Sequence, residues 1–211
     1  MAALSNSVIS GARDYASSSF DVRQSFSAAA SFSIPGIKKK GAISALTGGW
    51  SFDAVAVART GFPFNGVILL ASPDPSGFAL SRPDLVPGQP LWIPNSSAAD
   101  GKSLNPVAFA IPPTSRQGTE GRNDISGFDL VQVDFSLARK FPLTDRLNLQ
   151  FRADAFNVLN HPNFTNPPAF VEFGPPYLKS GQMLNQGLGG LSPLFQQGGP
   201  RSLQLSLKLS F

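Results

Sequence analysis

The feature that most constrains this chain is a long alternation of apolar and polar residues between residues 19 and 34. Alternation with a period of two is typical of a β-strand that has one apolar and one polar face. A strand of about fifteen residues is long for a globular protein, where five or six is common. It also exceeds the roughly 9–11 residues that a tilted strand needs to cross a bilayer. The apolar positions are Phe20, Val22, Phe26, Ala28, Ala30, Phe32 and Ile34, and Gln24 alone interrupts them.

Three further segments repeat this alternation. They cover residues 129–141, residues 146–158 and the last eleven residues, 201–211. Between the first two, Pro142-Leu-Thr-Asp145 has the Pro and Asp that suit a tight turn, which predicts a hairpin. The apolar positions are Val131, Val133, Phe135, Leu137 and Phe141 in the first segment, Leu147, Leu149, Phe151, Ala153 and Ala155 in the second, and Leu203, Leu205, Leu207, Leu209 and Phe211 in the third.

A weaker strand is predicted over residues 49–60. Trp50 and Phe52 lie at one parity of this segment, whereas Val55 and Val57 lie at the other. Either a β-bulge or a strand that is buried on both faces would explain the change of parity.

The segment from Leu147 to Leu159 has an alternative interpretation as an amphipathic helix. Leu147, Phe151, Ala155 and Leu159 lie at i, i+4 spacing, which would place them on one helical face. Leu149 would then be misplaced, and the tight turn before the segment favours a hairpin. A strand is therefore the preferred interpretation.

The connections between the predicted strands alternate in length. Residues 142–146 form a short turn and residues 35–48 a moderate one, whereas residues 61–128 and 159–200 are long and rich in Pro, Gly, Asn and Ser. Globular domains rarely contain structureless loops beyond about 12–15 residues. Outer-membrane β-barrels have short turns on the periplasmic side and long loops outside. If the last strand ends in the periplasm, all four connection lengths agree with that arrangement.

Composition excludes several other classes of protein. Charged residues make up only 14% of the chain, against roughly 25% in ordinary soluble domains, and no apolar run is long enough for a transmembrane helix. The chain has no cysteine, which excludes a disulfide framework and a thiolate metal site. Its net charge of +4 comes from scattered residues rather than from a basic stripe, so we expect no nucleic-acid partner.

The long two-faced strands favour a membrane barrel over a soluble sandwich. In a sandwich the apolar face meets another sheet, whereas in a barrel it meets lipid and the polar face lines the lumen. The predicted polar faces are rich in Ser, Gln, Asp and Arg, and the apolar faces are expected to carry no charge. A secreted β-sandwich that binds or adheres to a partner is the alternative. No nucleophile elbow, metal cluster or cofactor loop is present, so we expect neither an enzyme nor a cofactor.

Several segments resemble a known family of membrane proteins. The end of the chain, Arg201-Ser-Leu-Gln-Leu-Ser-Leu-Lys-Leu-Ser-Phe211, resembles the terminal strand by which outer-membrane barrels are recognised for assembly. The segment from Leu149 to Phe164 resembles the last part of Oar-like TonB-dependent receptors. Further stretches that fit this family, in order, are Thr60-Gly-Phe-Pro-Phe64, Arg82-Pro-Asp-Leu85, Asn105-Pro-Val-Ala-Phe109 and Gly121-Arg-Asn123.

This resemblance implies a 22-stranded barrel in the bacterial outer membrane, with an amino-terminal plug and a segment that contacts TonB. It implies energy-coupled uptake of an unknown substrate, and it assigns Leu203, Leu205, Leu207, Leu209 and Phe211 to the barrel-assembly signal. About five strands, no plug and no signal peptide are expected in this sequence, so we interpret it as the carboxy-terminal part of such a barrel. Its expected partners are outer-membrane lipid, the barrel-assembly machinery, the remaining barrel and plug, and TonB through the missing amino-terminal part.

The remaining candidate site residues are given structural interpretations. His161, the only histidine, lacks the partners of a metal site or a catalytic triad and is expected to begin a loop. Asp134, Arg152 and Asp154 are expected to form a solvated network on the polar face rather than to perform acid–base chemistry. Residues 38–40, all lysine, are expected to lie in a solvated periplasmic turn.

Overall fold

The computed structural model describes residues 15–36, 47–71, 78–113, 117–171, 174, 178, 179, 184 and 198–211. The chain divides into two compact units. The sheet unit contains Ser25–Arg59, Leu130–Asn163 and Met183–Phe211, and the loop unit contains Met1–Gln24, Thr60–Asp129 and Phe164–Gln182. Among the described residues, no helix is long and apolar enough to span a membrane.

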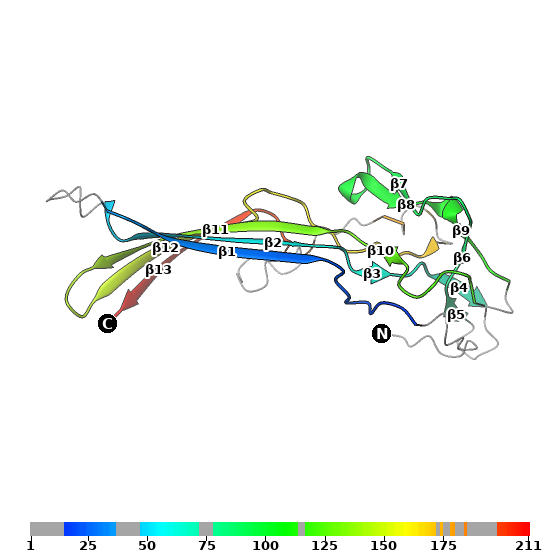
Figure 1. The fold of residues 1–211 in the computed structure, drawn as a ribbon, viewed down its shortest axis with the longest axis horizontal. Helices are drawn as coiled ribbons and strands as arrows, with labels where there is room; N and C mark the ends of the chain where they lie inside the picture. The colour runs from blue at the N-terminus through cyan, green and yellow to red at the C-terminus, as the bar shows by residue number, and fades with distance from the viewer. Residues whose placement is uncertain are drawn as a thin grey trace. The chain divides into compact units, whose positions relative to one another are not determined.

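The sheet unit is built on one antiparallel sheet of five long strands (Figure 1). In spatial order the strands are β1 (Ser25–Ile34), β2 (Trp50–Arg59), β11 (Leu130–Pro142), β12 (Asn148–Phe156) and β13 (Ser202–Ser210). The predicted all-β fold with five long antiparallel strands is therefore confirmed.

The first strand is shorter than its sequence pattern predicts. Strand β1 begins at Ser25, directly after the Gln24 that interrupts the apolar alternation. Residues 18–21 form a turn instead, in which the Asp21 N–H donates to the Ser18 carbonyl at 2.9 Å. The predicted start of this strand at residue 19 is therefore wrong, because Phe20 and Val22 belong to the loop unit.

Strand β2 contains no β-bulge. All ten of its residues pair in unbroken register with β1, and all ten pair in the same way with β11. Nine of the ten side chains are half-buried, and Val55 is exposed. Val55 and Val57 therefore lie on the face opposite Trp50 and Phe52. Both faces of β2 are partly covered, because β2 is an inner strand of the sheet.

Residues 148–156 form a strand, so the helical alternative is wrong. The register pairs Phe141 with Leu149 and Phe135 with Ala155. The turn before β12 closes through the Leu143 N–H, which donates to the Leu147 carbonyl at 2.8 Å. The Thr144 hydroxyl oxygen also accepts from the Leu147 N–H at 3.1 Å. These bonds stabilise the hairpin that the Pro142–Asp145 turn signal predicts.

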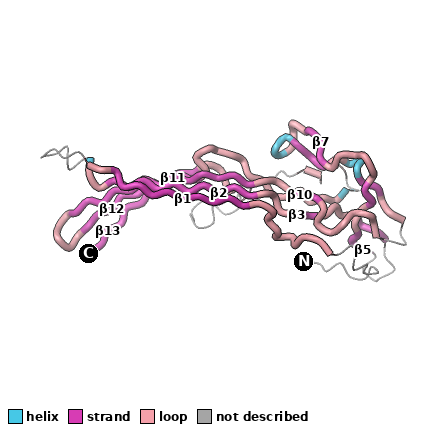
Figure 2. Tube along the Cα trace, viewed as in Figure 1, coloured by secondary structure: helices cyan, strands magenta, loops and turns pink. Residues whose placement is uncertain are grey.

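The segment predicted as a long loop, residues 61–128, contains short strands and turns (Figure 2). Four antiparallel pairs are present among its described residues: β3 with β10, β4 with β5, β6 with β9, and β7 with β8. The elements are β3 (Pro63–Phe64), β4 (Ile68–Ala71), β5 (Phe78–Ser81), β6 (Asp84–Leu85), β7 (Trp92–Pro94), β8 (Lys102–Leu104), β9 (Phe109–Ala110) and β10 (Ile125–Ser126), with 3₁₀ turns at Ala99–Gly101 and Pro106–Ala108.

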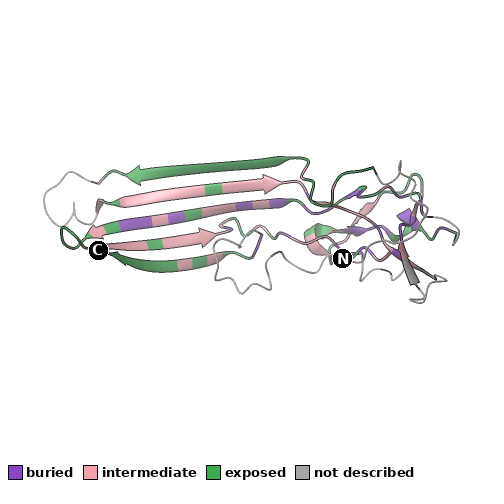
Figure 3. Cartoon of the chain, turned by 90° about the horizontal axis from the view of Figure 1, so that it is seen from below, coloured by how far each residue is buried: buried purple, intermediate pink, exposed green. Residues whose placement is uncertain are grey.

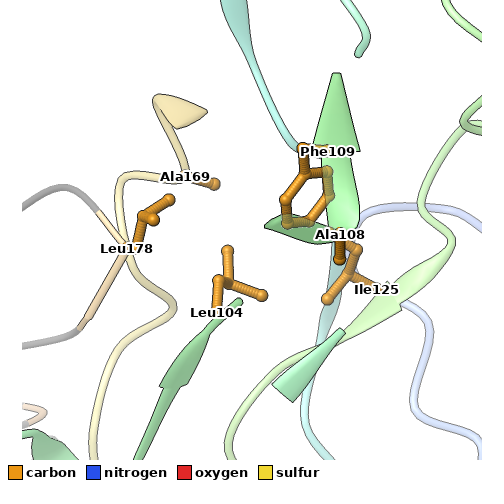
Figure 4. Packing of buried hydrophobic residues seen from close by; sticks show 6 residues of the cluster. All are labelled: Leu104, Ala108, Phe109, Ile125, Ala169 and Leu178. Carbon is orange, nitrogen blue, oxygen red and sulfur yellow. The ribbon is translucent and has the colours of Figure 1, made fainter. Parts of the chain in front are cut away.

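The loop unit has its own small apolar core (Figure 4). The Asn105 side chain helps to shape it, because its Oδ1 accepts from the Val107 N–H at 3.2 Å and its Nδ2 donates to the Pro90 carbonyl at 2.9 Å. These bonds hold the 3₁₀ turn that directs Ala108 and Phe109 inward. The buried members of the core are Leu104, Ala108, Phe109, Ile125, Ala169 and Leu178.

Candidate functional site

One face of the five-stranded sheet is almost entirely apolar. The register aligns rows of apolar side chains across all five strands, such as Ala30, Ala54, Phe135, Ala155 and Leu203. Because side chains alternate between the two faces of a strand, one parity of each strand supplies this surface. Its members are Phe26, Ala28, Ala30, Phe32 and Ile34; Trp50, Phe52, Ala54, Ala56 and Ala58; Val131, Val133, Phe135, Leu137 and Phe141; Leu149, Phe151, Ala153 and Ala155; and Leu203, Leu205, Leu207 and Leu209.

The apolar face is most exposed on the two edge strands (Figure 3). Phe26 and Phe32 of β1 are each 60% exposed, and Leu207 of β13 is 71% exposed. Exposed apolar patches larger than a few hundred Å² are rare on soluble monomers and mark contact with lipid or another protein. A face of this length and chemistry is suited to contact hydrocarbon.

The residues assigned to the assembly signal lie together on this face. Leu203, Leu205, Leu207 and Leu209 pair with Ala155, Ala153, Phe151 and Leu149 of β12. Phe211 follows the last residue of β13 and is fully exposed. The four leucines therefore form the apolar parity of an edge strand, Phe211 follows that strand, and the role of all five residues in assembly stays a prediction.

Arg139 is a charged residue on the apolar face, so the expectation of an uncharged face was wrong. It lies near the end of β11, with its guanidinium carbon 5.2 Å from the Trp50 ring centroid and 4.3 Å from that of Phe141. Cations stack favourably on aromatic faces, and aromatic residues gather at the membrane–water interfaces of barrels. The position is therefore compatible with lipid because the charge lies at the strand end among aromatic rings.

The opposite face of the sheet is mostly polar, although Val55 and Val57 of β2 also lie on it. The Ser31 hydroxyl donates to Oδ1 of Asp53 at 2.5 Å, which joins β1 to β2. Arg152 and Asp154 form an ion pair on β12, with 2.8 Å between Nε and Oδ1. The register also places Ser136 opposite both Asp53 and Asp154. Such a surface suits a wet lumen rather than a second apolar sheet.

Asp134 belongs to a structural network at one end of the sheet. Its carboxylate accepts from Gln132 Nε2 and from the backbone N–H of Asn157, each at 2.8 Å. The Gln132 Oε1 in turn accepts from the Gly198 N–H at 2.6 Å. These bonds tie the start of β11 to the residues on either side of the β12–β13 connection, so the carboxylate has a structural role.

Asn157 and Asn163 hold the backbone beside β12 through hydrogen bonds, in a structural clasp that the sequence interpretation missed. Asn157 is buried, donates from Nδ2 to the carbonyls of His161 and Gly199 at 2.8 Å each, and accepts the His161 N–H at 3.1 Å. Asn163 is also buried and bonds both the N–H and the carbonyl of Val131. The positive φ of 48° at Asn157 is tolerated best by Asn, Asp or Gly. The asparagines at positions 157, 160 and 163 recur every three residues, and this spacing is the sequence signal that could have revealed the clasp.

His161 lies within this Asn157–Asn163 clasp. Its ring Nδ1 is 3.3 Å from the Asn163 Oδ1, and its backbone carbonyl accepts from both asparagines. Within the described part of the chain, no group of three or more His, Cys, Asp or Glu side chains could hold a metal ion. The segment 38–40 lies outside the described residues.

In the loop unit, an aromatic chain connects elements that are distant in the sequence. The Trp92 ring packs edge-on against Phe64 and Phe128, with centroid distances of 6.3 and 5.4 Å. Phe128 extends the chain to Phe164 at 6.0 Å. Lys102 Nζ lies 5.3 Å from the Trp92 centroid and pairs with Asp100 at 3.2 Å. The arrangement presents partly exposed aromatic rings beside a cation.

The four short motifs of the loop unit form a connected structure. The Glu120 N–H donates to the Pro83 carbonyl at 3.1 Å, and the Thr119 N–H donates to Asp84 Oδ1 at 2.9 Å. The Asn123 N–H donates to the side-chain oxygen of Asn65, just after the Phe-Pro-Phe segment. Glu120 itself is fully buried at the point where these segments meet.

A long antiparallel sheet with one lipid-compatible face and one polar face defines an integral membrane protein of the β-barrel class. A family model described as "outer membrane beta barrel domain" matches residues 3–204. The chain belongs to this family, which places it in the bacterial outer membrane. The alternative of a soluble β-sandwich is therefore wrong. Searches among curated proteins and among solved structures found no significant match.

Proposed function

We propose that this chain forms the carboxy-terminal part of the barrel of an Oar-like TonB-dependent receptor, which takes up an as yet unidentified substrate with energy from the inner membrane. The observation that carries the proposal is the distribution of connections at the two ends of the sheet. The short turn between Pro142 and Asn148 and the end of β13 lie at one end, where Asn148 pairs with Ser210. Ile34 and Trp50 also pair at this end.

The long connections leave the sheet at the opposite end. Arg59 pairs with Leu130 there, so residues 60–129 begin and finish at that end. Phe156 and Ser202 likewise pair there across the β12–β13 connection. Short turns on one side and long loops on the other are typical of outer-membrane barrels, and in a receptor such loops would meet the substrate outside the cell. The partly exposed Trp92 and Lys102 in the loop unit are suited to such contact.

The sheet edges support the presence of further strands. Bacterial barrels of single chains have at least eight strands, and an unpaired edge in lipid costs several kcal/mol for each unsatisfied polar group. Because five antiparallel strands leave β1 and β13 running in the same direction, they cannot pair antiparallel with each other. An odd number of additional strands, beginning and finishing antiparallel to these two, would close an even-numbered barrel.

The proposed partners follow from this arrangement. Outer-membrane lipid would contact the apolar face, and the barrel-assembly machinery would bind β13 through Leu203–Leu209 and Phe211. The remaining strands would pair with β1 and β13, and a plug would contact the polar face that contains Asp53 and Asp154. TonB would be contacted only by an amino-terminal part of the receptor.

The proposal is tested on the protein isolated from outer membranes with an antibody against residues 84–110. We expect a polypeptide much longer than 211 residues that forms cross-links to TonB in living cells. The cross-links should disappear when the segment preceding the plug is deleted, while the barrel still inserts. A native polypeptide of 211 residues would contradict the proposed closure, and a full barrel without TonB cross-links would contradict the energy coupling alone.

A further inference from the structure

The carboxyl group of Glu120 lies in an unusual environment in the loop unit. The side chain is 0% exposed. Its Oε1 accepts a hydrogen bond of 2.8 Å from the Gly66 N–H. Its Oε2 is buried and has no hydrogen-bond partner among the described residues. A buried carboxylate oxygen without a partner is costly, whereas a protonated carboxyl tolerates such a site better.

The carboxyl of Glu120 is closely packed beside Gly66. A Cβ atom added to Gly66 would lie 3.0 Å from Glu120 Oε2, 3.1 Å from Pro83 Cγ and 3.4 Å from Phe109 Cε1. The backbone of residues 117–124 also lies against the Arg82–Pro83 segment, since the Gly118 N–H donates to the Arg82 carbonyl at 3.1 Å. Glu120 therefore joins three segments that are distant in the sequence: Gly66, the Arg82–Pro83 segment and residues 117–124.

The charged groups around Glu120 do not neutralise it. Burial raises the pKa of Glu120 to about 8, the Gly66 N–H opposes this shift, Asp124 adds to it and Arg82 opposes it. The Asp124 carboxylate accepts from the Gly121 N–H at 2.8 Å. The nearby Asp84 carboxylate accepts from the Thr119 N–H at 2.9 Å. Glu120 thus retains a proton at neutral pH in the folded loop unit.

We propose that Glu120 is a proton-controlled latch, which when protonated holds residues 117–124 against Gly66 and Pro83, and when deprotonated releases them. Opening of the loop exposes the carboxyl to water, where its pKa returns to the ordinary value near 4.5. The folded group binds its proton more tightly than the opened group. Its stabilising contribution is therefore fully present below about pH 4.5 and is lost as the pH rises through about 8. The latch acts on the loop unit and does not depend on energy-coupled transport.

Hydrogen exchange of the barrel protein in detergent micelles tests the latch. Exchange is measured by mass spectrometry at pH 5.5, 6.5, 7.5 and 8.5 and corrected for the intrinsic rate at each pH. Protection of the peptide that covers residues 117–124 should fall by up to about tenfold for each pH unit and should level off above about pH 8. Protection of Lys102–Leu104, in the same unit, should not follow this dependence.

The Glu120→Gln variant isolates the carboxyl from other titrating groups. An amide keeps the shape and the acceptor for the Gly66 N–H but has no proton to lose at these pH values, so protection of residues 117–124 should stay within about threefold. The control is Asp100→Asn, an exposed carboxylate of the same unit, which should retain the wild-type dependence. Unchanged pH dependence in Glu120→Gln would overturn the proposal. If that variant does not fold, equal pH dependence of the two wild-type peptides would overturn it.

Discussion

The rings of Phe52 in β2 and Phe135 in β11 lie with their centroids 5.2 Å apart and their planes tilted by 54°. The two residues come from strands that residues 60–129 separate in the sequence. They meet diagonally, because the register places Phe135 opposite Ala54 and Phe52 opposite Leu137. The contact lies on the apolar face of the sheet. It therefore joins two inner strands on the surface that meets lipid.

This ring contact should be measurable as a coupling energy. Aromatic pairs in such tilted geometry contribute roughly 0.5–1.5 kcal/mol beyond the area they bury. We expect a double-mutant cycle of Phe52→Ala and Phe135→Ala, measured by reversible unfolding in phospholipid bilayers, to give a coupling energy in that range. The same cycle on Phe26 and Phe135, which lie on strands that do not pair, should give about zero. Equal coupling in the two cycles would contradict the packing.

Asn157 should be essential for the junction beside β12. Replacing it with Ala leaves the Gly199 carbonyl without its donor and the His161 N–H without its acceptor, and each buried unsatisfied group costs about 1–3 kcal/mol. The loss of an Asn with positive φ adds a backbone cost. Asn160→Ala is the matched control, because Asn160 also has a positive φ of 51° but is exposed.

The difference between the two variants measures the clasp without the backbone contribution. We expect Asn157→Ala to lower the free energy of unfolding by at least about 2 kcal/mol more than Asn160→Ala does. Urea unfolding of the protein in bilayers provides the measurement. Variants of equal stability would show that the hydrogen bonds of Asn157 contribute nothing to the fold.

Phe211 should affect assembly much more than final stability. It follows β13 and is fully exposed, so its removal deletes no packing within the described chain. We expect deletion of Phe211 to reduce the fraction of protein inserted in the outer membrane, measured by membrane fractionation and by heat-modifiable migration in gels. Ser210→Ala, the neighbouring change, should insert normally. Normal insertion without Phe211 would refute its role as part of the assembly signal.

Four of the five long strands were predictable because each has one apolar parity, whereas β2 was predicted as a weaker strand because Val55 and Val57 lie at the parity opposite Trp50 and Phe52. The alternation of Leu203, Leu205, Leu207 and Leu209 predicts their common face, whereas their register with β12 is seen only in the structure. The start of β1 was placed too early, since alternation alone cannot show that Asp21 turns back to Ser18. Arg139 lies between Leu137 and Phe141 at the apolar parity of β11, so this charge is already visible in the sequence.

The contacts of the loop unit could not be predicted from the sequence. Its strands have two to four residues, which is too short for periodicity to be seen. The burial of Glu120 depends on Gly66 and Pro83, which lie 54 and 37 residues away and carry no pattern that relates them to it. The Asn157 clasp depends similarly on Gly199, which is 42 residues away. Such contacts are properties of the folded topology rather than of local sequence.

In the barrel, the parity of β13 that contains Leu205 faces lipid, and the parity that contains Gln204 faces the lumen. The most direct test measures the free energy of unfolding in phospholipid bilayers for Leu205→Arg and Gln204→Arg. Leu205 lies near the middle of β13, where an arginine in lipid costs about 2–4 kcal/mol. An arginine at Gln204 would lie opposite Asp154 on the polar face, so its cost should be below about 1 kcal/mol. An equal loss of unfolding free energy in the two variants, or a larger loss at Gln204, would contradict this orientation of β13.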